Sequence, residues 1–409
     1  LDRLLALHDP EVEIFVVEGS DGQEWYGGGH YGQAGALTLA GHLPADPPLG
    51  PAWFRDSLGI RANYVAGAMA GGIGSAEIVI AMGRAGYIGF FGAGGLGLDA
   101  VRESVVRIRE ALGDTHPAGF NLLHNPVEPQ VEESTVDLYL EHGCTLVSAS
   151  AYMGLTPAIV RFRYSGATRD AEGRPLCHRR VLAKVSRPEV AEHFLRPPPE
   201  KLLGEMVAQS QLTAEEAAIA RELPVAEGIT CEADSGGHTD HRPLTVILPV
   251  IRALRDRVVR EEGYASRGVR VAIGAAGGLG EPRSILAAHA LGAEYVLTGS
   301  VNQCSLEAGT SEAAKRMLLS AGLADVASGA APDMFEIGAH VQVLSRGSMY
   351  ASRSNRLYQL YKDYADWSLV PEKEREKLEK RVFARSFDEI WQECESYWGQ
   401  RDPAQVERA

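Results

Sequence analysis

The chain has 409 residues, with 40 Lys and Arg against 54 Asp and Glu, a formal net charge of −14 and a pI near 5.4. Apolar residues make up 45% and charged residues 23% of the chain, close to globular averages, which excludes a disordered or fibrous protein. The acidic balance argues against duplex DNA or an anionic membrane as the main partner, since both need a basic face.

Three further features concern the cellular setting. No run of about 18 uncharged apolar residues is present, so we expect no membrane-spanning segment. The first residues, LDRLLALHDP, lack the basic–apolar–small pattern of a secretory signal. The cysteines are odd in number, widely spaced and without a CxxC pair, so we expect neither a disulfide framework nor a metal site. We therefore expect a reduced, cytoplasmic protein. The cysteines are Cys144, Cys177, Cys231, Cys304 and Cys394.

Eight short apolar runs occur along the chain, most of them ending in or near glycine. Each run is nearly continuous in apolar residues rather than alternating, which is typical of parallel strands covered on both faces. The runs are residues 62–69, 87–94, 118–123, 145–152, 181–186, 229–237, 269–278 and 295–301.

Helical patterns fill most of the gaps between these runs. Strand–helix alternation repeated eight times within about 250 residues predicts an α/β fold, a (β/α)8 TIM barrel, with its active-site loops at the carboxyl ends of the strands. A doubly wound open sheet is the alternative, but it needs fewer strands. The helical patterns are Ser75–Gly86, Leu98–Leu112, Pro129–His142, Pro243–Glu262 and Pro282–Leu291.

Three regions lie outside the predicted barrel, which we assign to residues 51–303. Residues 1–50 predict a small β-containing N-terminal cap. Residues 187–226 form an insertion with a Pro-rich turn and a helix. Residues 304–409 carry mostly helical patterns and predict a helical C-terminal subdomain, packed over one end of the barrel as a lid.

Glycines after the last two predicted strands indicate an anion site. Gly277, Gly278 and Gly280 permit close approach of the backbone to an anion, while Gly299 and Ser300 can supply N–H groups and a hydroxyl. The loops after strands seven and eight of such barrels commonly bind phosphate. A Rossmann dinucleotide site fits less well, because no acidic residue ends a second strand about 20 residues further on. The simpler alternative is that these glycines only form tight turns.

The segment EADSGGHTDHRPL follows the sixth predicted strand. Gly236 and Gly237 remove side chains where a flat ring could lie, and His238 follows them at the strand end, directed toward the barrel mouth. A neutral imidazole can donate a hydrogen bond to a carbonyl or act as an acid near pH 7. The weaker alternative is a metal site formed by Asp234, Asp240 and His241.

Small and polar residues end other predicted strands and indicate one shared pocket. The backbone around Ala68, Met69 and Ala70 can hydrogen-bond a planar heterocycle, and Asn121 adds a side-chain amide. Lys184 places a positive charge at the same rim, where it would stabilise a reduced anionic flavin. Tyr152 and Met153 end the fourth predicted strand.

At these residues the sequence closely resembles the trans-acting enoyl reductases of trans-acyltransferase polyketide synthases and the PfaD-type enoyl reductases of polyunsaturated fatty acid synthases. Both belong to the nitronate monooxygenase (2-nitropropane dioxygenase-like) superfamily. The similarity extends from about Trp53 to Trp391. Its markers include MAGGIGSAEIVIAMGRAGYIGFFGAGGL, FNLLHNPVEP, GAAGGLG, LTGSVNQ and, as the most specific, EADSGGHTD.

The resemblance implies a barrel that holds FMN, takes hydride from NADPH and reduces an α,β-unsaturated thioester on an acyl carrier protein. It implies ring contacts at Ala68, Met69, Asn121 and Lys184, and His238 as the histidine after the paired glycines. One departure is His241, where we expect Asn in many relatives. The implied phosphate site is Gly277, Gly278, Gly299 and Ser300.

Carrier proteins are acidic, so docking to this acidic chain needs a local basic patch. Two other readings remain: an FMN-dependent nitronate monooxygenase, in which the reduced flavin reacts with oxygen, and a non-catalytic scaffold that binds carrier proteins. A homodimer is compatible with the sequence, but no feature establishes one. The candidate docking residues are Arg179, Arg180, Arg187, Arg196, Lys201, Arg346, Arg353, Arg356 and Lys362.

Overall fold

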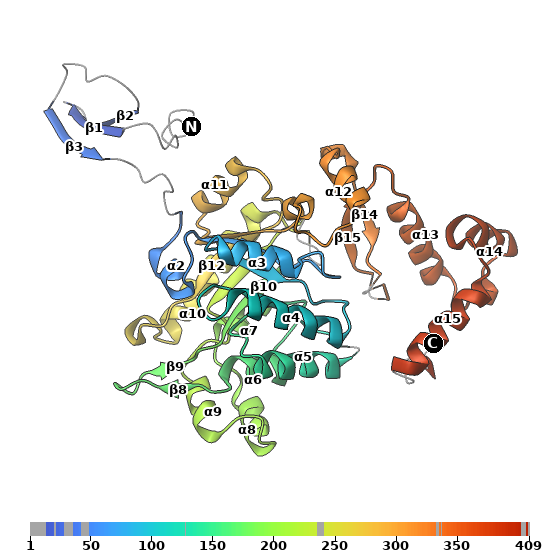
Figure 1. Ribbon diagram of the computed structural model, residues 1–409, viewed down its shortest axis with the longest axis horizontal. Coiled ribbons are helices and arrows are strands. Elements are labelled where there is room, and N and C mark those ends of the chain that lie inside the picture. Colours follow the sequence, from blue (N-terminus) through green and yellow to red (C-terminus); the bar gives the residue numbers. More distant parts are fainter. Residues whose placement is uncertain are drawn as a thin grey trace. The chain divides into compact units, whose positions relative to one another are not determined.

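A computed structural model gives the architecture (Figure 1). It describes the backbone of residues 14–19, 22–27 and 36–41, and residues 49–126, 128–234, 241–332, 335–336, 338–401 and 406–407. The chain divides into two compact units, Leu1–Lys315 and Arg316–Ala409. No helix within the described ranges combines the length and apolar character that crossing a membrane requires.

The first unit contains a closed barrel of parallel strands in the order β10-β11-β12-β13-β4-β5-β6-β7. Pairing of β13 with β4, with Leu297 opposite Val65, closes it. Every strand overlaps one of the predicted apolar runs, so the predicted (β/α)8 barrel is confirmed. The strands are β4 (Tyr64–Ala66), β5 (Ile88–Phe91), β6 (Gly119–Leu123), β7 (Leu146–Ser150), β10 (Arg180–Val185), β11 (Gly228–Glu232), β12 (Ala272–Ala276) and β13 (Tyr295–Thr298).

Helices follow the strands and cover the outside of the barrel, as Figure 1 shows for α3, α4, α5 and α6. Local signals begin them: the hydroxyl of Ser75 accepts from the N–H of Ile78 in α3, and Thr156 does the same for Ile159 in α6. Proline starts several others, where its missing N–H costs nothing. The helices are α3 (Ala76–Arg84), α4 (Leu98–Leu112), α5 (Pro129–Glu141), α6 (Pro157–Tyr164), α7 (Pro188–Leu195), α10 (Leu244–Glu261) and α11 (Pro282–Ala290).

The segment 187–226 holds more helix than the sequence predicted. It contains α7, α8 (Glu200–Ala208) and α9 (Ala214–Ala220) rather than a single helix. The short α9 begins in a capping box formed by Thr213 and Glu216. Such short helices are stabilised mainly by packing, which explains why periodicity alone did not separate them.

An aromatic plug fills the barrel at the amino ends of the strands. Helix α2 (Ala52–Leu58) contributes Phe54, whose ring stacks on that of Tyr295 at a centroid distance of 4.7 Å. Both side chains are buried. The Tyr295 hydroxyl lies 2.6 Å from that of Thr230, and burial raises the pKa of Tyr295 above its ordinary value. This end is therefore closed by packing, which leaves the carboxyl end for the site.

Gly274→Ala is expected to destabilise this plug. A Cβ at Gly274 would lie 2.3 Å from two ring atoms of Tyr295, whose ring also stacks on that of Phe54. Overpacking of this kind costs about 1–3 kcal/mol, so the melting temperature of the barrel should fall. The matched control is Gly97→Ala, because nothing lies within 4 Å of that Cβ position. Equal melting curves for both variants would contradict the packing argument.

Residues 14–41 include a three-stranded antiparallel sheet in the order β2-β1-β3. Ile14 pairs with Gly27 on one side and with Gly41 on the other. This sheet agrees with the β structure predicted for residues 1–50. Its strands are β1 (Ile14–Gly19), β2 (Gly22–Gly27) and β3 (Ala36–Gly41).

The second unit is largely helical, as predicted, but it also contains an antiparallel pair that the sequence did not predict. Gly329 lets α13 pack closely, since a Cβ there would lie 3.0 Å from Ser354 Oγ. The Asn355 amide bonds Ala330 N–H and Ser328 O along the strand edge. These contacts with α13 stabilise a strand whose sequence, VASGA, has weak β propensity. The elements from residue 312 onward are α12 (Glu312–Leu319), β14 (Val326–Ala330), β15 (His340–Leu344), α13 (Tyr350–Asp363), α14 (Glu372–Leu378) and α15 (Phe387–Arg401).

Candidate active site at the carboxyl end of the barrel

The loop after β4, which carries Ala68, Met69 and Ala70, is held by backbone contacts. Gly71 N–H donates to Gly94 O at 2.7 Å and Gly72 N–H to Gly92 O at 3.1 Å. A Cβ at Gly92 would lie 1.7 Å from Met69 O, so only glycine permits this approach. Ala68 and Met69 are half-buried and Ala70 is exposed. The loop is thus a rigid ledge at the barrel mouth.

Asn121 is buried on β6 with its amide orientation set by a neighbour. Ser150, at the end of β7, donates its hydroxyl to Asn121 Oδ1 at 2.9 Å. The Asn121 carbonyl accepts from the hydroxyl of the buried Tyr139 at 2.7 Å. With Oδ1 engaged by Ser150, the Asn121 NH2 group is the end that faces the Gly94 side of the mouth, 3.8 Å from where a Cβ of Gly94 would lie.

Lys184 on β10 forms an ion pair with Glu232 on the neighbouring strand β11. Nζ lies 2.7 Å from Oε1, and the two side chains are 12% and 10% exposed. The sequence predicted Lys184 but missed Glu232. The available signal was a glutamate at the carboxyl end of the adjacent predicted strand, whose buried charge needs a partner.

Glycines after β12 and β13, here called the glycine cradle, lie at the carboxyl ends of these strands, where the sequence predicts an anion site. Gly277 and Gly278 have φ values of +97° and +71°, and a Cβ at Gly277 would lie 3.0 Å from that of Ala233. A Cβ at Gly299 would meet nothing within 4 Å, and Ser300 is exposed. Without side chains the backbone at these positions is open to a ligand, so these residues leave room for a phosphate.

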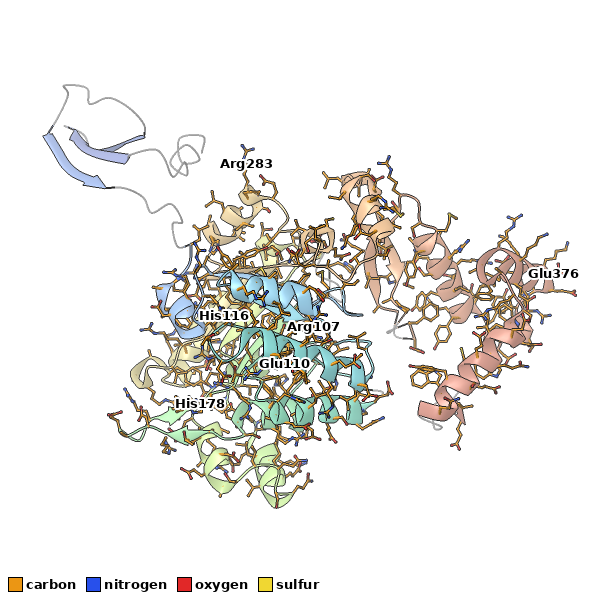
Figure 2. The ribbon with its side chains drawn as sticks, viewed as in Figure 1. Arg107, Glu110, His116, His178, Arg283 and Glu376 are labelled. Carbon is orange, nitrogen blue, oxygen red and sulfur yellow. The ribbon has the colours of Figure 1, made fainter. Side chains whose placement is uncertain are left out.

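The predicted anion site relies on backbone N–H groups rather than on a basic side chain. Arg283, at the start of α11, is exposed and points away from the barrel strands (Figure 2). The loop after β13 is held instead by hydroxyl and amide groups: Tyr64 and Thr298 hydroxyls lie 2.8 Å apart, and Asn302 Nδ2 donates to Thr298 O at 3.1 Å. These contacts position Gly299, and the sequence did not reveal them.

The segment with Gly236, Gly237, His238 and Asp240 lies outside the described residues, which resume at His241. Its two ends are described. Ala233 N–H donates to Ala276 O at 3.0 Å and Asp234 N–H to Arg242 O at 3.1 Å. The roles of Gly236, Gly237 and His238 therefore stay predictions.

A second buried acid is Glu132 on α5, which contacts residues that follow β6 and β7. Oε1 accepts from Tyr152 Oη at 2.8 Å and from the Thr156 hydroxyl, while Oε2 lies 2.9 Å from His124 Nδ1. Burial, and then the nearby carboxylate, raise the pKa of Tyr152 well above its usual range. Met153 is exposed at the surface. The sequence assigned no role to His124 or Glu132.

Several candidate docking cations are engaged within their own unit. Arg179 bonds Ser165 O and Arg180 bonds Ser57 O. Arg196 bridges Glu192, Glu261 and Glu262. In the second unit, Arg346 lies 3.6 Å from Asp325, Arg356 pairs with Glu374 at 2.8 Å and Lys362 lies over the Tyr358 ring. Lys201 and Arg353 are exposed.

Fold and site together define a (β/α)8-barrel protein with glycine-lined loops and a buried Lys–Glu pair at the carboxyl ends of its strands. Comparison with solved structures finds the enoyl reductase domain of MlnA from the macrolactin biosynthesis cluster of Bacillus amyloliquefaciens. It has a TM-score of 0.84 and 36% identity, covering 88% of this chain and 80% of that chain.

Curated relatives agree with this comparison. One component of the polyunsaturated fatty acid synthase of Thraustochytrium sp. is 45% identical over 363 residues, and polyketide biosynthesis protein ThaF of Burkholderia thailandensis is 45% identical over 362 residues. Each alignment covers 88% of this chain, which spans 24% and 30% of those relatives. Residues 364–409 match the inserted helical domain of [acyl-carrier-protein] S-malonyltransferase.

The chain belongs to the family of enoyl reductases of polyketide and polyunsaturated fatty acid synthases. This confirms the family resemblance that the sequence motifs indicated.

Proposed function

We propose that this chain is an FMN-dependent, NADPH-using, trans-acting enoyl reductase. Its substrate would be an enoyl thioester on an acyl carrier protein in polyketide or polyunsaturated fatty acid biosynthesis. The observation that carries the proposal is the similarity to an enoyl reductase domain across 88% of the chain.

The residues at the barrel mouth fit FMN. Gly277, Gly278, Gly299 and Ser300 would hold its phosphate through backbone N–H groups and the Ser300 hydroxyl, which need no neighbouring cation; the open space at the Cβ position of Gly299 supports this. The ledge of Ala68, Met69 and Ala70, the Asn121 amide and the Lys184 ammonium would contact its ring. When bound, FMN supplies a two-electron carrier between NADPH and the enoyl thioester.

The side chains at the barrel mouth would then stabilise the negative charges that develop on the ring and on the thioester. Lys184 would favour a reduced, anionic ring. His238, on the loop between the ends Ala233 and Arg242, would donate a hydrogen bond to the thioester oxygen as negative charge develops there, or a proton to the α-carbon. Gly236 and Gly237 would leave room for the flat ring beside it.

The partner would be an acyl carrier protein. The match of residues 364–409 to an inserted domain of an acyl-carrier-protein malonyltransferase supports this, as do relatives that are synthase components. We propose that the second unit contains the carrier-binding surface.

An anaerobic absorbance scan before and after NADPH, and then after a crotonyl thioester, tests the function. A flavin spectrum that NADPH bleaches and the thioester restores would establish the reductase. Restoration by oxygen but not by the thioester, free or carrier-bound, would favour the monooxygenase alternative. A protein that stays colourless after incubation with FMN would refute the proposal and favour a scaffold.

If the second unit binds the carrier protein, a substitution of Arg353 should weaken that binding. Arg353 is exposed on α13, whereas Arg356 is paired with Glu374, so Arg353 is the cleaner target. Arg353→Glu should raise the KM for a carrier-bound enoyl substrate, leave the KM for a small thioester unchanged, and act less at high salt. Arg283→Glu on α11 is the charge-matched control. Equal changes of KM for both substrates would contradict a docking role for Arg353.

A further inference from the structure

The buried carboxylate of Glu132 is arranged around one histidine. Its side chain is 2% exposed and its oxygens accept from Tyr152 and Thr156 on one side and face His124 on the other. A carboxylate buried this deeply is costly unless its hydrogen-bonding capacity is met. Two hydroxyls and one imidazole meet it here, so the cluster is a complete network rather than a stray ion pair.

Glu132 contacts one nitrogen of the His124 ring, Nδ1, at 2.9 Å. An ionised carboxylate can only accept, so this contact favours the tautomer with the proton on Nδ1 and leaves Nε2 as the nitrogen that Glu132 does not engage. The His124 ring stacks on that of Tyr152 at 5.3 Å, and its side chain remains 21% exposed. A buried carboxylate that bonds Nδ1–H orients an imidazole and stabilises its protonated form, as in catalytic triads.

His124 lies at the end of the barrel where the site is. It directly follows β6, and its N–H donates to Ser150 O at 3.0 Å. Ser150 also bonds the Asn121 amide, so one residue links the proposed ring contact to the histidine. By contrast, His116 and His178 precede β6 and β10 and so lie at the amino ends of these strands.

The backbone beside this network contains one residue in a strained conformation, Ala151. Ala151, between Ser150 and Tyr152, has a φ of +62°, a left-handed conformation that costs a residue with a Cβ about 1–2 kcal/mol. The turn directs the next residue, Tyr152, inward to Glu132. Strain retained at the end of a barrel strand is typical of functional sites.

We propose that His124, positioned by Glu132, is the acid that protonates the α-carbon, which leaves His238 to bond the thioester oxygen. The inference rests on the proposed function. Hydride adds to the β-carbon, and the π electron pair of the C=C bond moves to the α-carbon. That carbon forms its new C–H bond with the Nε2 proton of the doubly protonated His124 ring, and the N–H electron pair stays on Nε2. The ring, now neutral with its proton on Nδ1, takes up one proton from the solvent, so the thioester has gained one hydride and one proton.

His124→Asn tests the proposal, because the Asn amide keeps a donor toward Glu132 and removes the acid. The NADPH-reduced protein is mixed anaerobically with a crotonyl thioester and, separately, with ferricyanide, which takes electrons without protonating carbon. We expect the thioester step to slow about 100-fold, the range of general acid catalysis, and the ferricyanide step to keep its rate. His116→Asn, the same change at the exposed opposite end, is the control.

Glu132 provides an independent second variant that keeps His124. Glu132→Gln should slow the thioester step and spare the ferricyanide step, and Glu132→Asp should recover part of the loss. An unchanged thioester rate in both the His124 and Glu132 variants, or equal slowing with both oxidants, would overturn the assignment. A wild-type protein that ferricyanide oxidises but the thioester does not would instead refute the proposed function, and the inference with it.

Discussion

Lys184→Met and Glu232→Gln are expected to move the reduction potential of the bound flavin in opposite directions. The Lys184 ammonium would favour the reduced, anionic ring, so its removal lowers the potential. The Glu232 carboxylate, 2.7 Å from that ammonium, offsets part of its charge, so its removal raises the potential. The measurement is a spectroscopic redox titration against a reference dye, and shifts of the same sign would refute the assigned ring contact.

The same pair predicts a pattern of stability that does not depend on flavin. Lys184→Met leaves the Glu232 carboxylate buried without its cation, which is expected to cost about 3 kcal/mol. The double variant Lys184→Met/Glu232→Met removes both charges and should recover most of that loss. Urea unfolding of the flavin-free protein measures this. A double variant no more stable than the single one would show that the pair does not act as a unit.

Gly299→Ala is expected to release FMN while leaving the fold intact. A Cβ at Gly299 would meet no protein atom within 4 Å, so the added methyl enters space that a phosphate would need. Loss of one or two charge-assisted hydrogen bonds weakens binding by roughly 10- to 100-fold. Fluorescence titration of the flavin-free protein with FMN gives the Kd, and riboflavin, which lacks the phosphate, should show little change.

Gly277→Val is the contrasting substitution in the same cradle. Gly277 has a φ of +97°, and its Cβ would lie 3.0 Å from that of Ala233, so valine is expected to lower both the melting temperature and FMN affinity. Gly97→Ala is again the control, since nothing lies within 4 Å of that Cβ position. Unchanged FMN affinity in both Gly277→Val and Gly299→Ala would place the phosphate elsewhere.

The barrel could be predicted, and the glycines at its strand ends located, because both depend on local patterns. A parallel strand covered on both faces is a continuous apolar run, and the runs at 118–123 and 295–301 correspond closely to β6 and β13. The loops after strands seven and eight adjoin in any such barrel, so Gly277 and Gly299 could be paired without coordinates.

The hairpin β14–β15 could not be predicted, because VASGA has little β propensity and contacts from α13, including those of Asn355, support its edge. The number of helices in 187–226 was underestimated for a related reason, since short helices depend on the surface they cover.

The sequence by itself determined the fold class, the family motifs and the strand ends that carry Lys184, Asn121 and the glycines. Only the tertiary structure decided which buried side chains form ion pairs or hydrogen bonds with one another. Glu232 reaches Lys184 across 48 positions, and Tyr152 reaches Glu132 across 20. The physical reason is that a buried polar group must find its partner in three dimensions, and a partner distant in sequence leaves no periodic or local signal.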